Sequence, residues 1–427
     1  MALIVISTMM LFRILTKEDF AVWGYYLLCT YFIEMGRSGL LQNGLIRLLA
    51  RADPHSPNYR RVCDAALYLS LAYSALSSLA LLLLAPSLAR AWQSPMLATL
   101  LPYYIPVNFA MMWYMHANYV QQARFEFRGI FWGALTYRGV LFAYVFGVWK
   151  GGYHMELYHL PLSMLVGAAL AGGASWRFAR PHLRHTFVFG KKTAFELLNY
   201  GRYVLGTNLS AMFYKSVDKM ALGYWVGPAA FSVYEAASRI TQLIEMPSFS
   251  IAQVLFPRTA AETAKTDGGN LAQLYERSVA AVLGIVLPFI VGVLLFAEPL
   301  VRFFAGERYV DASGLLRLTV FFGLFLPFAV QFGALTDATG RAALNFRITF
   351  FTALLNLGLS ALLIPIYGLY GAALATLSGY AISFVIMQFF LQKLFGTRWY
   401  RAFGYIGSFY VLAWEKIRGY WKRLRNR

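Results

Sequence analysis

Residues 278–297 read SVAAVLGIVLPFIVGVLLFA, twenty consecutive positions without a charged side chain. An α-helix of that length rises ~30 Å at ~1.5 Å per residue, which matches the ~30 Å hydrocarbon core of a bilayer. The whole chain shares this character, because 59% of its 427 residues are apolar and only 13% are charged. A soluble protein carries about a quarter charged residues. The sequence therefore predicts a membrane-embedded protein.

Apolar stretches of this kind recur along the chain, separated by charged residues or by glycine and proline. Together they predict an all-α, polytopic membrane protein with about twelve transmembrane helices. The first stretch rises only ~22 Å, so we expect that the start of this helix is missing from the sequence or that it begins as a turn at the membrane interface. The predicted helices are Met1–Leu15, Phe20–Ile46, Val62–Ala85, Leu97–Val120, Ile130–Trp149, Leu157–Phe178, Leu197–Trp225, Ala230–Leu255, Ala272–Ala297, Ala312–Thr336, Ala342–Pro365 and Tyr370–Phe395.

The basic residues lie mainly in alternate loops. Of 38 Lys and Arg residues, 25 lie in loops, helix ends or terminal segments on one side of the predicted bundle, five lie on the other side and eight are assigned to the helix interiors. Cytoplasmic loops of membrane proteins are enriched in Lys and Arg. The richer side is therefore predicted to be cytoplasmic, and the even number of helices places both termini there.

Basic connections follow the second and the eighth predicted helix, which is the same position in two units of six helices. This pattern predicts a parallel repeat with a central cavity between two six-helix bundles. The predicted domains are an N-terminal bundle (1–178), a basic cytoplasmic linker (179–196), a C-terminal bundle (197–395) and a basic amphipathic cytoplasmic tail (396–427). The tail suits contact with anionic lipids of the inner leaflet, and it fits equally well a positively charged terminus with no further task.

Ionisable side chains inside the predicted helices mark candidate functional sites, because a charge in the hydrocarbon core costs several kcal/mol unless it is paired or hydrated. Cations outnumber carboxylates in these segments, which predicts an anionic substrate. Arginine favours phosphate or diphosphate, since its planar group binds two oxygens at once. The cations are Arg13, Arg37, Arg138, Arg202, Lys215, Lys219, Arg239 and Arg317, and the carboxylates are Glu34, Asp218, Glu235 and Glu245.

Depth and spacing select among these residues. Arg239 lies near the middle of its predicted helix, four residues after Glu235 on the same face, so the two form either part of a substrate site or a structural ion pair. Arg138 lies ~12 Å into its helix, without an acidic residue within four positions. The predicted substrate-binding residues are Arg37, Arg138, Lys215, Lys219 and Arg239, and the predicted coupling or ion-pairing residues are Glu34, Asp218 and Glu235.

The sequence predicts no catalytic residue, no metal site and no cofactor. The two cysteines, Cys29 and Cys63, form no paired motif, and His182 and His185 lie in a basic segment without a third ligand. A nucleic-acid partner is not expected either, because hydrophobic blocks separate the positive charge into short loops.

Residues 214–257, YKSVDKMALGYWVGPAAFSVYEAASRITQLIEMPSFSIAQVLFP, resemble the polysaccharide-flippase branch of the multidrug/oligosaccharidyl-lipid/polysaccharide exporter superfamily. That pattern has an aspartate before an apolar run, a glycine turn, a tyrosine and an arginine in the next helix and a terminal proline. Supporting stretches are RILTKEDFAVWGYY (13–26), DATGRAALN (337–345) and NLGLSALLIPIYGLYGAALAT (356–376). The shortened first helix departs from the family, as does Arg37, where an apolar residue is more usual. The matching positions here are Asp218, Gly227, Tyr234, Arg239 and Pro257.

The resemblance implies two six-helix bundles that export undecaprenyl-diphosphate-linked oligosaccharide repeat units across the bacterial inner membrane by alternating access, for O-antigen or exopolysaccharide biosynthesis. It implies membrane lipids as partners, with a polysaccharide polymerase and other assembly proteins as further candidates. Two alternatives remain open from the residues. One is a drug/cation antiporter of the same superfamily, and the other is an integral membrane glycan polymerase or acyltransferase.

Overall fold

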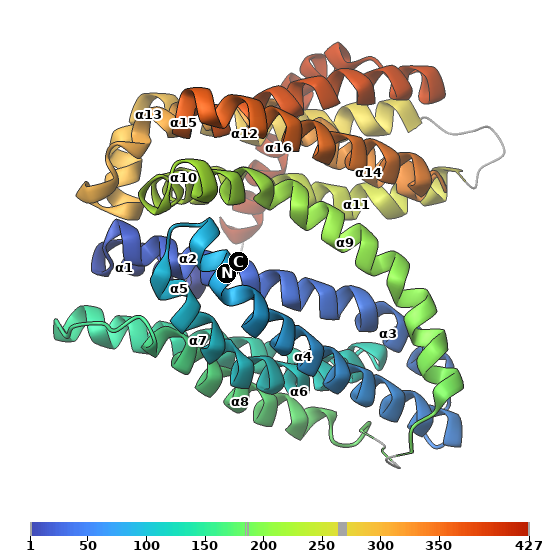
Figure 1. Ribbon diagram of the computed structural model, residues 1–427. Coiled ribbons are helices and arrows are strands. Elements are labelled where there is room, and N and C mark those ends of the chain that lie inside the picture. The colour runs from blue at the N-terminus through green and yellow to red at the C-terminus, as the bar shows by residue number, and fades with distance from the viewer. Residues whose placement is uncertain (1, 184, 186–187, 264–270, 426–427) are drawn as a thin grey trace. The chain divides into compact units, whose positions relative to one another are not determined.

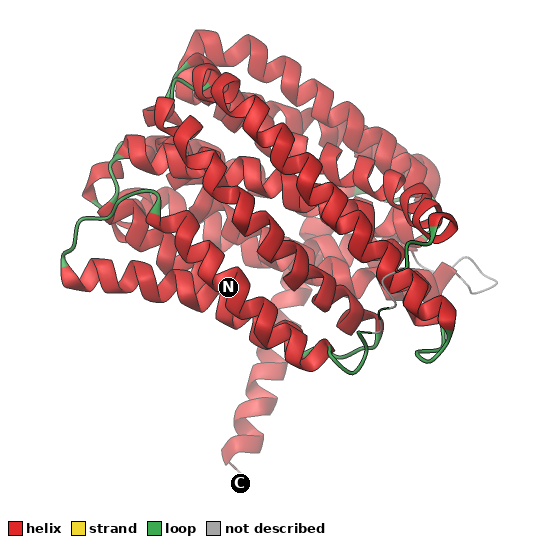
Figure 2. Cartoon of the chain, turned by 60° about the horizontal axis from the view of Figure 1, so that its bottom comes forward, coloured by secondary structure: helices red, strands yellow, loops and turns green. Residues whose placement is uncertain are grey.

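The computed structural model describes residues 2–183, 185, 188–263 and 271–425, and these residues form helices and connecting loops without a strand among them (Figure 2). Each of the twelve apolar stretches is helical within the described residues, which confirms the all-α fold. The chain divides into two compact units, one of residues 1–216 with 227–232 and one of residues 217–226 with 233–427. The division falls inside one long helix, whereas the domain boundaries read from the sequence stay a prediction.

The first unit contains a run of helices in which α8 packs against both α6 and α7 (Figure 1). Its second membrane segment is continuous from α2 through η1 to α3, and η1 is a π-helix, a form that is frequent at functional sites. The elements are α1 (Ala2–Ile14), α2 (Lys17–Arg37), η1 (Ser38–Gln42), α3 (Asn43–Arg51), α4 (Pro57–Ala91), α5 (Pro95–Leu100), η2 (Leu101–Tyr103), α6 (Tyr104–Ala123), α7 (Arg128–Gly151), α8 (His159–Ala179) and the first part of α9 (Lys191–Trp225).

The second unit begins in the last part of α9, and its core includes residues of α12, α14 and α15. Several of its membrane segments are broken by short 3₁₀ turns. Its elements are α10 (Pro228–Thr241), η3 (Gln242–Ile244), α11 (Glu245–Thr263), α12 (Leu271–Ala305), η4 (Glu307–Tyr309), α13 (Ala312–Thr319), η5 (Val320–Leu324), α14 (Leu326–Ala338), α15 (Ala342–Phe395) and α16 (Trp399–Arg425).

The element α15 consists of two helices that meet at Gly368. This glycine has φ 55° and ψ −127°, a conformation that residues with a Cβ rarely adopt. The two halves then run side by side, since Ser383 Oγ donates a hydrogen bond of 2.8 Å to Thr352 Oγ1. Two of the predicted helices, which end at Pro365 and begin at Tyr370, therefore form a hairpin.

Five helices of the described chain are long and apolar enough to cross a membrane by length and composition, namely Pro57–Ala91, Arg128–Gly151, Leu271–Ala305, Ala312–Ala338 and Ala343–Phe395. Other helices combine apolar residues with charged ones, as α9 does with its lysines and aspartate. Many of the large apolar side chains on these spans are exposed, among them Leu83, Leu295 and Val385. Exposed aliphatic side chains on long helices are what lipid contact requires.

The basic segment after α8 contacts side chains of α4 and of the loop between α6 and α7. His185 Nδ1 lies 2.9 Å from the buried Asp64 carboxylate, and Tyr59 donates a hydrogen bond to the carbonyl of His182. The imidazole of His182 in turn lies 3.0 Å from Glu126. These contacts attach the described part of the predicted linker to the first bundle.

The C-terminal helix α16 packs against α12 within the second unit. The backbone N–H of Arg398 donates to Glu276, and the Tyr410 hydroxyl donates to the carbonyl of Gly284. The ring of Phe409 lies so close to Gly284 that an added Cβ would stand 2.6 Å from it. The first half of the predicted tail is thus attached to a membrane helix, while its contact with anionic lipids stays a prediction.

Two glycines bring α9 into contact with the π-helical segment of the first unit. A Cβ added at Gly201 would lie 1.9 Å from the carbonyl oxygen of Leu40, and one added at Gly39 would lie 2.8 Å from the Cα of Leu205. Both obstacles are backbone atoms, which cannot rotate away as a side chain can. Small residues at helix crossings permit this approach in membrane proteins.

We expect Gly201→Ala to destabilise the first unit by about 2 kcal/mol or more, because the new methyl group forces the two backbones apart. Gly206→Ala on the same helix is the matched control, since nothing lies within 4 Å of its added Cβ. There alanine gains up to about 1 kcal/mol of helix propensity over glycine. Thermal unfolding of both variants in detergent checks the prediction, and equal midpoints would contradict it.

Candidate functional site

A tight turn sets the geometry of the charged residues in the second unit. Gly227 has φ 110°, in the left-handed region that favours glycine, and Pro228 begins α10 directly after it. The chain therefore reverses between the last turns of α9 and the first turns of α10. Residues before the turn are brought opposite residues after it, and this places Asp218 and Lys219 beside Tyr234 and Glu235.

The carboxylate of Glu235 is shared by two cations. Lys219 Nζ lies 2.6 Å from Glu235 Oε2, and Arg239 Nε lies 2.8 Å from Glu235 Oε1. The Glu235 side chain is only 6% exposed. The i,i+4 pair expected from the spacing is present, and Lys219 joins it from α9. One positive charge remains in excess within this group of three, which we call the Glu235 triad.

The guanidinium of Arg239 forms an ion pair with Glu235, although Nε makes no recorded hydrogen bond. Its side chain is 35% exposed, and the recorded ion pair uses Nε. Among the described residues, no hydrogen bond or ion pair is recorded for its two terminal nitrogens. Glu235 therefore holds one edge of the planar group, while the terminal N–H groups stay available for another acceptor.

Asp218 lies next to the Glu235 triad and is held by neutral donors. It accepts hydrogen bonds from the Tyr234 hydroxyl, from Thr376 Oγ1 at 3.3 Å and from the backbone N–H of Lys219 at 2.9 Å. Thr376 comes from α15, far along the chain. Asp218 is buried, so this group joins α9, α10 and α15 within the second unit.

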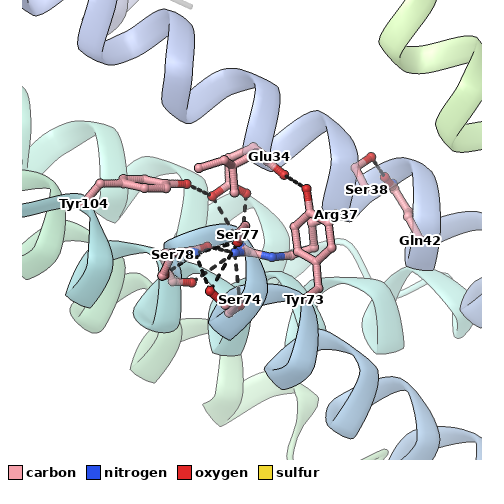
Figure 3. A network of polar contacts seen from close by, with 11 residues as sticks. Glu34, Arg37, Ser38, Gln42, Tyr73, Ser74, Ser77, Ser78 and Tyr104 are labelled. Carbon is pink, nitrogen blue, oxygen red and sulfur yellow. Dashed lines mark hydrogen bonds and ion pairs between the residues drawn. The ribbon is translucent and has the colours of Figure 1, made fainter. Parts of the chain in front are cut away.

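A second polar network surrounds Arg37 in the first unit (Figure 3). The Arg37 side chain is fully buried, and its Nη1 forms an ion pair with Glu34 at 3.2 Å. Its Nη2 donates to Ser74 Oγ and to both the side-chain and the backbone oxygen of Asn108. The Tyr104 hydroxyl donates to Glu34 Oε1, which also accepts from Arg37 Nη1 at 3.3 Å. The network joins α2, α4 and α6.

Asn108 lies at the centre of this network. Its amide nitrogen donates to the carbonyl of Ser74 and to the hydroxyls of Ser77 and Ser78. Asn108 was not predicted from the sequence. The polar stretch YSALSS at positions 73–78 contains its hydrogen-bond partners. Several polar side chains in one apolar helix were the available sign that a polar residue of another helix lies opposite.

The structure brings some of the sequence-selected residues together and leaves others apart. Lys219, Glu235 and Arg239 form one group with Asp218 beside it, and Glu34 and Arg37 form another. The Arg138 side chain on α7 is exposed, and no acidic partner is recorded for it among the described residues. Lys215 on α9 is exposed as well. Substrate binding and ion coupling stay predictions for all of these residues.

A family model described as "Polysaccharide biosynthesis protein" matches residues 10–314, which is more than half of the chain. The chain belongs to this family. The match covers the Arg37 network and the Glu235 triad, so both groups lie inside the family region. The family expected from residues 214–257 is thereby confirmed.

Curated relatives are similar over part of their length. A probable low-salt glycan biosynthesis flippase of Haloferax volcanii is 25% identical over 47% of this chain and 43% of its own length. An amylovoran biosynthesis protein of Erwinia amylovora is 25% identical over 56% of this chain and 61% of its own length. The chain thus matches less than two thirds of each of these relatives.

Solved structures share the fold at low sequence identity. An inward-facing multidrug resistance MATE family transporter of the MOP superfamily superposes with a TM-score of 0.78 at 15% identity, covering 95% of this chain and 94% of that one. The lipid II flippase MurJ in an inward closed conformation gives 0.75 at 16% identity, covering 92% of this chain and 85% of that one. The chain therefore has the fold of these polytopic membrane transporters.

Proposed function

We propose that this protein is a flippase that moves undecaprenyl-diphosphate-linked oligosaccharides across the bacterial inner membrane by alternating access, for O-antigen or exopolysaccharide biosynthesis. Its membership of a polysaccharide biosynthesis family supports the pathway. Relatives named as a probable glycan flippase and an amylovoran biosynthesis protein support the substrate class. The transporter fold supports translocation rather than covalent chemistry.

The observation that carries the proposal is the geometry of Arg239. Its Nε lies 2.8 Å from the buried Glu235 carboxylate, and this ion pair keeps the guanidinium beside Glu235 before a substrate arrives. A planar group with free terminal N–H donors can bind two oxygens of one phosphate at once. Preorganisation of this kind reduces the entropy lost on binding. Arg239 is therefore the proposed diphosphate ligand.

The other ionisable residues take supporting roles in this proposal. Lys219 gives the Glu235 triad, counted without the neighbouring Asp218, one net positive charge, and the exposed Lys215 and Arg138 add positive charge to the first unit. Arg37 is predicted to bind substrate, and its complete burial also fits the role of holding three helices together. The proposed ion-coupling residues are Glu34, Asp218 and Glu235.

The membrane setting of the proposal follows from the distribution of charge. The 25 Lys and Arg residues on one side of the predicted bundle support a cytoplasmic location of both termini. In that orientation substrate enters from the cytoplasm and leaves on the outer face. A polysaccharide polymerase that takes up the exported unit is the proposed downstream partner.

Reconstitution into liposomes tests this function. A fluorescent undecaprenyl diphosphate that carries an oligosaccharide is distributed over both leaflets, and a reductant added outside bleaches only the outer leaflet. We expect bleaching beyond one half in the presence of the protein, because inner-leaflet probe reaches the outside. Bleaching that stops at one half, together with export of a cationic dye, would instead favour the drug/cation antiporter.

A further inference from the structure

A cavity of about 410 Å³ lies within the first unit. It is lined by residues of α2, η1 and α6 and of the start of α7, beside the Arg37 network (Figure 3). Its volume falls in the range of about 300–1,000 Å³ that is typical of small-molecule sites. The cavity lies toward the end of the unit that carries the basic loops, because Gln122 in its wall is two residues from Arg124.

The walls of this cavity have little net charge. No lysine or arginine is among the described residues that line it, and the carboxylate of Glu34 is paired with the buried Arg37 outside the wall. A diphosphate would leave most of its charge uncompensated in such a place. The cavity is therefore suited to a neutral ligand, in contrast to the cationic Glu235 triad.

A chain of hydrogen bonds orients the polar groups of the wall. Ser38 Oγ donates to Gln42 Oε1 at 2.7 Å, and Gln42 Nε2 donates to Gln122 Oε1 at 3.1 Å. The chain ends at the amide nitrogen of Gln122, for which no acceptor is recorded among the described residues. Gln122 thus presents two N–H donors from a side chain whose oxygen is already held.

Aromatic side chains line the cavity together with these polar groups. Tyr31 on α2 is 50% exposed and Phe127 before α7 is 55% exposed, and both line the cavity. No hydrogen bond of the Tyr31 hydroxyl is recorded among the described residues. A ring face combined with fixed amide donors suits a ligand that has an apolar face and a rim of hydroxyl groups. A pyranose ring has this combination, whereas an isoprenoid chain lacks the hydroxyl groups.

We propose that this cavity binds a hexose or hexosamine ring of the lipid-linked saccharide, with Gln122 donating to a sugar hydroxyl and Tyr31 stacking on the ring. The assignment rests on the proposed flippase function and separates two tasks. Cationic residues elsewhere bind the charged diphosphate that all such carriers share, and this cavity contacts the sugar. The cavity is thus a determinant of saccharide specificity.

Binding to two probes tests the assignment with the full-length protein in detergent or nanodiscs. One probe is undecaprenyl diphosphate, and the other is undecaprenyl diphosphate carrying one N-acetylglucosamine. We expect Gln122→Ala and Tyr31→Ala each to weaken binding of the sugar-bearing probe about fivefold, since a neutral hydrogen bond or an aromatic contact contributes about 1 kcal/mol. Binding of the bare diphosphate stays unchanged.

Gln392→Ala, at an exposed position of α15 in the second unit, is the matched control and leaves both affinities unchanged. Tyr31→Phe keeps the ring and retains most of the affinity, which separates stacking from a folding defect. If Gln122→Ala weakens the binding of both probes equally, or weakens the binding of neither, the saccharide assignment is overturned. A wild-type protein that binds neither probe overturns the proposed flippase function itself, so the two failures are distinct.

Discussion

Replacing Arg239 by glutamine is expected to reduce flipping of a diphosphate-linked saccharide about 100-fold. The substitution removes two charge-assisted hydrogen bonds to the phosphate, each worth about 1.5 kcal/mol or more, and every 1.4 kcal/mol is a factor of ten. The fold should persist, because Glu235 keeps its ion pair with Lys219 at 2.6 Å. Initial rates in the liposome bleaching assay measure the effect.

Arg302→Gln is the matched control for this prediction. Arg302 pairs with Glu298 four residues earlier at 2.7 Å, which is the same spacing as Arg239 with Glu235, but this pair is exposed and lies near the C-terminal end of α12. The control should flip at the wild-type rate. Arg239→Lys should reduce the flipping rate about tenfold, since an ammonium keeps the charge without the two-donor geometry. Wild-type flipping by Arg239→Gln would remove this residue from the mechanism.

Replacing Arg37 by leucine is expected to destabilise the first unit by about 3 kcal/mol. The substitution leaves the Glu34 carboxylate and the Asn108 oxygens without their buried donor, and breaking a buried ion pair by removing one partner costs about 3–5 kcal/mol. The lower end of this energy range applies because the Glu34 side chain is 20% exposed. Thermal unfolding and the yield of monodisperse protein measure the loss.

The double variant Glu34→Gln/Arg37→Leu should recover part of this stability, because a neutral amide is less costly to leave unpaired than a carboxylate. Arg138→Leu is the control, since that arginine is exposed and has no recorded ion-pair partner among the described residues. It should change stability little. If Arg37→Leu unfolds at the wild-type temperature but no longer flips, Arg37 contacts substrate rather than holding the helices.

The helices could be predicted from the sequence because hydropathy reports which stretches leave water. The stretch 278–297 needed no other information, and α12 contains it entirely. Local departures from the regular helix were not predicted, such as the π-helix at Ser38–Gln42 and the 3₁₀ turn at Gln242–Ile244. These depend on the hydrogen-bond register and on neighbouring backbones, which an apolar pattern does not encode.

The candidate site was predictable only where its members are close in sequence. The pairs Glu34–Arg37 and Glu235–Arg239 follow from helical spacing, because residues three or four apart share a face. Lys219 reaches Glu235 through the reversal at Gly227, and this turn residue was noted only as part of the family pattern. The amides that line the cavity of the first unit were missed, since uncharged polar residues in apolar helices were given no weight.

The amino-acid sequence alone determined that the chain is a polytopic helical membrane protein with an excess of cations inside its helices, and it pointed to the family. These properties follow from composition, spacing and short motifs, each of which is local along the chain. The tertiary structure decided which cations are paired and which keep free donors. Burial of Arg37 against Asn108 and sharing of Glu235 between Lys219 and Arg239 are contacts between helices. Such contacts depend on packing in three dimensions, where residues distant in sequence meet.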